Sequence, residues 1–167
     1  MLFINNIQFK FSSDKMKVAI VSGKAEGPTK LNSFDNALIE AGIGDVNLIK
    51  VSSMLEENTS LELLPKLKAG AMVNCVLATV TSNKEGDFIS SAIAIAIGNN
   101  LGCVVENSAV NKSSEKVKKD AEDMVKYMMD RRDENINEII IEEVNHTVED
   151  IGTVVASLVY LNDDIVV

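Results

Sequence analysis

Runs of apolar and β-branched residues predict that β-strands make up most of the regular structure of this chain. The expected strands fall at residues 17–23, 46–51, 71–81, 101–105, 138–145 and 153–161. Turn signals that contain glycine separate several of these runs. The polar and acidic stretch 54–60 shows no such pattern, so it is predicted to be a loop.

Apolar residues at helical spacing predict three helices. Asn32 or Ser33 can cap the first of them. Residues 89–97 predict the second helix, and a strand stays open as the alternative for this segment. Ser113 or Ser114 can cap the third and longest helix. One apolar stripe on that helix is expected to face the core, and it consists of Val117, Ala121, Met124, Val125 and Met128.

Strands and helices do not alternate regularly, so the pattern favours an α+β fold over a doubly wound sheet. The 167 residues suit a single domain, and an apolar content of 46% is too high for a disordered chain. No uninterrupted apolar run is long enough to cross a bilayer. Because residues 1–15 do not resemble a signal peptide, we expect a cytoplasmic protein without membrane contact.

The net charge argues against nucleic-acid binding, and the scarcity of His and Cys ligands argues against metal binding. The formal net charge of −9 argues against a nucleic-acid-binding protein, which needs clustered Lys and Arg. Cys75 and Cys103 lie in apolar runs and are expected to be buried thiols rather than a disulfide. His146 is the only histidine, so no zinc site or other metal site is expected.

The most informative polar feature is the adjacent pair Ser52 and Ser53, which directly follows a predicted strand. By itself such a pair usually ends a strand or caps a helix. Upstream, Asn47 has an amide that can donate hydrogen bonds, most simply to a loop. Glu106 follows another apolar strand, and Asp35 is expected in a first helical turn, where the helix dipole favours a carboxylate.

The serine pair belongs to one of five sequence segments that together are informative. They are LNSFDNAL at 31–38, AGIGDVNLIKVSSM at 41–54, LPKL at 64–67 with Gly70-Ala71, GDFISSA at 86–92, and HTVE at 146–149 with Gly152. Together they resemble the pyruvoyl-dependent arginine decarboxylases, in order and with similar spacing from about residue 18 to residue 160. The residues after Glu106 differ from the pattern of that family.

The resemblance implies a four-layer αββα sandwich and a chain that cuts itself. In that family the second serine attacks the carbonyl of the first, so cleavage is expected between Ser52 and Ser53. The products would be a β chain, residues 1–52, and an α chain, residues 53–167. A pyruvoyl group generated from Ser53 would then be the covalent cofactor. The protomers are expected to form trimers or dimers of trimers.

The resemblance also implies a role for each polar residue named above. Asn47 matches the donor that stabilises the oxyanion formed during cleavage, and Glu106 matches the catalytic glutamate that protonates the product. Asp35 matches the residue that binds the guanidinium group of the substrate. Ser52 would line the same pocket as the new carboxyl terminus. His146 has no catalytic match and is expected to be structural.

The implied reaction converts L-arginine to agmatine and CO2 through a Schiff base between the pyruvoyl ketone and the substrate amine. Three alternatives stay open on the sequence alone. The substrate could be another amino acid, the chain could be a non-catalytic paralogue with the same fold, or it could be an ordinary α+β binding domain in which the Ser-Ser pair is coincidental.

Overall fold

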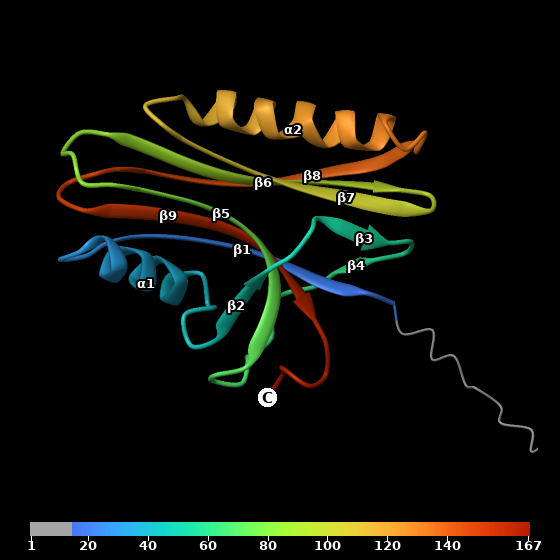
Figure 1. Ribbon diagram of the computed structural model, residues 1–167, viewed down its shortest axis with the longest axis horizontal. Helices are drawn as coiled ribbons and strands as arrows, with labels where there is room; N and C mark the ends of the chain where they lie inside the picture. The colour runs from blue at the N-terminus through green and yellow to red at the C-terminus, as the bar shows by residue number, and fades with distance from the viewer. Residues whose placement is uncertain (1–14) are drawn as a thin grey trace, which may run out of the picture.

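Two β-sheets lie one above the other in the computed structural model, which describes residues 15–167 (Figure 1). One helix packs against each sheet, on the side away from the other sheet. The described residues therefore form an α+β domain, as the sequence predicts, with two helices rather than three. Neither of these helices is both long and apolar enough to span a membrane.

The first sheet has the strand order β2-β5-β9-β1-β4. Its strands are β1 (Lys17–Glu26), β2 (Asn47–Lys50), β4 (Ser60–Leu61), β5 (Met72–Ser82) and β9 (Gly152–Leu161). β9 pairs antiparallel with both β1 and β5, whereas the short edge strands β2 and β4 run parallel to their neighbours. The helix α1 (Lys30–Glu40) packs against β1 and β9.

The second sheet has the strand order β3-β7-β6-β8 and is antiparallel throughout. Its strands are β3 (Met54–Glu56), β6 (Phe88–Gly98), β7 (Leu101–Val110) and β8 (Ile136–Thr147). The helix α2 (Ser114–Asp130) packs against β6, β7 and β8. Because β3 and β4 lie within residues 54–61, the prediction of a loop over 54–60 is only partly correct.

β6 is a strand that is buried on both faces, so the helix predicted over 89–97 is wrong and the strand alternative is correct. Its alanines Ala92, Ala94 and Ala96 pack with α2, whereas Ile93 and Ile95 pack between the two sheets. Isoleucines four residues apart fit a helix as well as a strand, but this division of alanine from isoleucine has the two-residue period of a strand.

The first helix begins earlier than the sequence predicts. Thr29 is its N-cap, and the side-chain oxygen of Thr29 accepts a hydrogen bond of 3.2 Å from the backbone N–H of Asn32. Asp35 therefore lies in the second turn, where the helix dipole no longer explains a carboxylate. The apolar face of this helix consists of Ala37, Leu38 and Ala41, which are buried against the first sheet.

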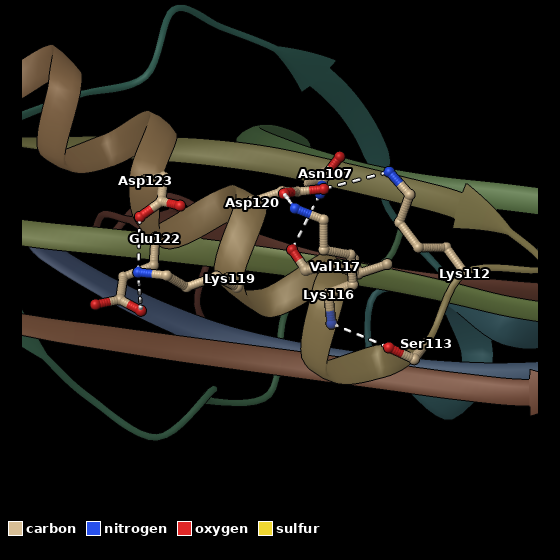
Figure 2. Close-up of polar contacts among 9 residues, drawn as sticks. All are labelled: Asn107, Lys112, Ser113, Lys116, Val117, Lys119, Asp120, Glu122 and Asp123. Carbon is tan, nitrogen blue, oxygen red and sulfur yellow. Dashed lines mark hydrogen bonds and ion pairs between the residues drawn. The ribbon is translucent and has the colours of Figure 1, made fainter.

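Ser113 is the N-cap of α2, as predicted, and its hydroxyl oxygen accepts from the N–H of Lys116 (Figure 2). The Asn107 side chain on β7 donates 3.0 Å to the carbonyl of Val117, which ties the first turn of α2 to the sheet. Exposed ion pairs, such as Lys116 with Asp120 at 2.6 Å, follow the outer face. Solvent screens such exposed pairs, so they stabilise little, and the buried residues Val117, Ala121, Val125 and Met129 hold the helix in place. Met124, which the sequence predicts in this stripe, is instead 40% exposed.

His146 has a structural position at the end of β8, as the sequence analysis expects. Its Nε2 lies 2.6 Å from Oε1 of Glu26. The same oxygen accepts a hydrogen bond from the backbone N–H of Glu149, and Oε2 of Glu26 accepts one from the N–H of Asp150. Burial alone would raise the pKa of Glu26, but these hydrogen bonds outweigh it and hold that pKa below its usual value. The Glu26 carboxylate thus closes the turn between β8 and β9.

Candidate active site

Ser52 and Ser53 lie on the connection between β2 and β3, where the chain passes from one sheet to the other (Figure 1). The backbone is held on both sides of the pair. Val51 donates its N–H to the carbonyl of Cys75 at 3.1 Å, and the carbonyl of Ser53 accepts from the N–H of Val104 at 2.9 Å. The peptide between the two serines is therefore fixed between the sheets, and Ser52 is exposed.

A further backbone hydrogen bond acts on the carbonyl that the family reaction would attack. The N–H of Met54 donates to the carbonyl oxygen of Ser52 at 3.1 Å, which is the i to i+2 bond of a γ-turn centred on Ser53. A donor in this position can stabilise negative charge that develops on that oxygen. This donor could not be predicted from the sequence, because every residue type except proline has a backbone N–H.

Tyr160 is a second group that the sequence analysis missed. It lies on β9 in the first sheet, and its hydroxyl donates 3.0 Å to the carbonyl oxygen of Met54 in the second sheet. Burial raises the pKa of the Tyr160 phenol, so it stays protonated and can donate. A tyrosine near the end of an apolar strand is ordinary core composition, and nothing in the sequence links it to residue 54.

Glu106 lies near the serine pair. The register of β3 and β7 places Met54 opposite Cys103, so residues 52 and 53 continue toward Val105 and Val104 and approach Glu106. A carboxylate oxygen of Glu106 is 3.9 Å from the Lys50 ammonium group. The Glu106 side chain is 40% exposed in the described chain.

Asn47 is at the opposite end of β2 from the serines. Its side-chain amide donates 2.9 Å to the carbonyl of Gly70, the loop contact that residue type alone suggests. Five extended residues at about 3.3 Å each separate it from Ser52 by about 16 Å. Within one chain, therefore, the Asn47 amide does not reach the Ser52 carbonyl. The oxyanion role implied by the resemblance would need the Asn47 of a second copy of the chain.

Asp35 is exposed on α1. Its neighbours one turn away on the same helical face are Leu31 and Ile39, which are 74% and 57% exposed. Among the contacts of residues 15–167, none joins Asp35 to Ser53 or Glu106. The chain thus brings together Ser52, Ser53 and Glu106 but leaves Asn47 and Asp35 apart from them.

A family model and several known proteins similar to this chain all carry the same description. A sequence model of the family described as pyruvoyl-dependent arginine decarboxylase (PvlArgDC) matches residues 17–164. The chain is 58% identical over 147 residues to the pyruvoyl-dependent arginine decarboxylase of Methanothermobacter thermautotrophicus, covering 88% of this chain and 97% of that protein. Proteins of the same name from Methanocaldococcus jannaschii and Pyrococcus furiosus are 36% and 38% identical, over 84% and 80% of this chain and 86% and 87% of their own lengths.

Proposed function

The chain belongs to the pyruvoyl-dependent arginine decarboxylase family, and from this membership we propose that it cuts itself and converts L-arginine to agmatine and CO2. The observation that carries the proposal is the serine pair held between the two sheets, with Glu106 close by. Its substrate is accordingly a small molecule, and a cytoplasmic location stays a prediction from the sequence.

The residues at the cleavage site fit a pyruvoyl group made from the backbone. The Ser53 hydroxyl attacks the carbonyl carbon of Ser52, and the peptide bond becomes an ester. Elimination then releases residues 1–52 with a free Ser52 carboxylate and leaves dehydroalanine at position 53. Addition of water and loss of ammonia convert this residue to the pyruvoyl end of residues 53–167. The Met54 N–H at 3.1 Å from the Ser52 oxygen supports the first step.

Once formed, the pyruvoyl group supplies a ketone that binds the substrate amine and accepts the electrons left when CO2 departs. The residues of the chain supply what remains of the reaction. Glu106 delivers a proton to the α-carbon of the substrate after CO2 has left. Asp35 pairs with the guanidinium group, which a carboxylate can bind with two parallel hydrogen bonds. Ser52 lines the pocket with its new carboxylate.

The same proposal includes a homo-oligomer, a trimer or a dimer of trimers, of protomers with a four-layer αββα sandwich. Two observations support an assembly. Asp35 is flanked by exposed Leu31 and Ile39 on one face of α1, and a second protomer that covered this face would remove both side chains from water. Asn47 and Asp35 also need a second protomer if they are to approach Ser53. The mass of the native protein in solution checks this part.

Substitution of Asp35 is expected to weaken arginine recognition without preventing cleavage. A guanidinium–carboxylate pair contributes about 1.5–3 kcal/mol, so the KM of Asp35→Ala for arginine should rise about 10- to 100-fold. The measurement is agmatine formation against arginine concentration, with lysine and ornithine as competing substrates. The control is Asp130→Ala, which removes an exposed carboxylate at the end of α2.

Two results would contradict this assignment. A fully cleaved Asp35→Ala protein with the wild-type KM for arginine would remove Asp35 from the substrate pocket. A wild-type protein that carries the pyruvoyl group but prefers lysine or ornithine would keep the mechanism and change the substrate to another amino acid.

A further inference from the structure

We propose that Tyr160 is a positioning residue: its phenol fixes the backbone at Met54 and thereby aims the chain end that forms at residue 53. The inference rests on the proposed function, since it concerns the same cleavage site. Tyr160 is not one of the residues that the family resemblance identifies in this sequence, and it does not contact Asp35, Asn47 or Glu106 in the described contacts.

The phenol adds a hydrogen bond between the two sheets, beside the apolar core that they share. Tyr160 lies on β9, and it packs against the apolar cluster between the sheets, whose buried members include Leu55 and Val104. Its hydroxyl reaches 3.0 Å to the carbonyl of Met54, the first residue of β3. Within the described residues, β3 is a three-residue edge strand that pairs only with β7. A short strand of this kind holds its own end weakly.

Cleavage removes the covalent link that holds residue 53 and Met54 from the Ser52 side. In the uncut chain, residue 53 is tied covalently to Ser52, and the N–H of Met54 donates to the Ser52 carbonyl. After cleavage Ser52 belongs to a separate chain, so its hold on Met54 is no longer covalent. Besides the pairing of β3 with β7, two hydrogen bonds to the backbone carbonyls of the new chain end lie within residues 53–167: the N–H of Val104 donates to the carbonyl of residue 53, and the Tyr160 hydroxyl donates to the carbonyl of Met54.

These two contacts lie on consecutive carbonyls and therefore fix the orientation of the first peptide. The Val104 bond alone leaves the chain end able to turn about the residue 53 carbonyl, whereas a second bond one residue later limits this rotation. The Tyr160 hydroxyl is well suited to the task, because its buried phenol stays neutral and keeps its proton. A displacement of about 1 Å at a reacting atom can cost up to about 100-fold in rate.

The test compares Tyr160→Phe with Tyr127→Phe. The first variant keeps the ring in the core and removes only the hydrogen bond to Met54, and the second removes the hydroxyl from the other tyrosine, which is 65% exposed on α2. Cleavage is followed by intact mass, and the pyruvoyl content is titrated with a carbonyl reagent. Decarboxylation of arginine is then expressed per pyruvoyl group, so that incomplete cleavage does not enter kcat.

We expect kcat per pyruvoyl group to fall about tenfold in Tyr160→Phe, with the KM for arginine within about twofold of wild type and Tyr127→Phe unchanged. A merely structural role for Tyr160 would lower the melting temperature or the cleaved fraction but leave this normalised kcat unchanged. Tyr160→Phe with the wild-type kcat per pyruvoyl group would therefore overturn the inference.

If Tyr160→Phe does not fold or cleave, a second pair of variants decides. Tyr160→4-aminophenylalanine keeps a donor at the same place, whereas Tyr160→4-methylphenylalanine keeps the size without the donor. Higher normalised kcat for the amino variant supports the inference, and equal values overturn it. A wild-type protein without any titratable carbonyl would instead refute the proposed function itself, which the first titration already reveals.

Discussion

Ser53→Ala is expected to give one uncut chain of 167 residues that does not decarboxylate arginine. Alanine has no hydroxyl to attack the Ser52 carbonyl, so neither the ester nor the pyruvoyl group can form. Activity should fall to the background of the assay, and a carbonyl reagent should not label the protein. The surroundings should be little disturbed, because the interactions that hold residue 53 come from its backbone carbonyl rather than from its hydroxyl.

Ser52→Ala is the matched control for this variant. It changes the neighbouring serine but keeps the attacking hydroxyl of Ser53 and the carbonyl that it attacks, so cleavage should still occur. Uncut Ser52→Ala protein together with cut Ser53→Ala protein would reverse the roles of the two serines and contradict the proposed chemistry. Both results can be measured by intact mass alone.

Glu106→Gln is expected to lower kcat by about two to four orders of magnitude, the usual contribution of a positioned proton donor. Glutamine has nearly the same shape and can still form hydrogen bonds, but it cannot deliver a proton to the α-carbon. The KM for arginine should change little, since substrate affinity is assigned to Asp35. The measurement is kcat per pyruvoyl group in the cleaved variant.

Glu138→Gln is the control for the loss of one carboxylate, because Glu138 is exposed on the edge strand β8. It should keep the wild-type kcat. Cleaved Glu106→Gln protein that also keeps the wild-type kcat would identify Glu106 as a strand-end residue that pairs with Lys50, and the proton donor would have to be sought elsewhere.

The spacing of apolar residues predicts most of the fold. It fails where the same spacing fits both the period of a helix and the period of a strand. The position and the cap of α2 are correctly predicted because their signals lie within the helix itself, but its stripe is only partly correct: Met124 is 40% exposed, and Met129 is buried instead. β6 is wrongly predicted as a helix because isoleucines at 89, 93 and 97 fit either period. Only the partners decide, since α2 covers the alanines and the first sheet covers the isoleucines.

The candidate site was predictable only in part, and for a different reason. Residue types and their order identify Ser52, Ser53 and Glu106, and the chain brings them together. The donor at Met54 is a backbone group, and the contact of Tyr160 crosses from one sheet to the other, so neither has a signal in the sequence. For Asn47 and Asp35, residue type and order do not reveal that each lies apart from the serine pair within one chain.

The most direct test of self-cleavage is the intact mass of the purified wild-type protein before and after treatment with a carbonyl reagent. We expect two chains that meet at residues 52 and 53, with the reagent bound once to the larger chain at its first residue. One uncut chain that does not react, even after prolonged warming, would contradict the self-cleavage and would favour a non-catalytic member of the family.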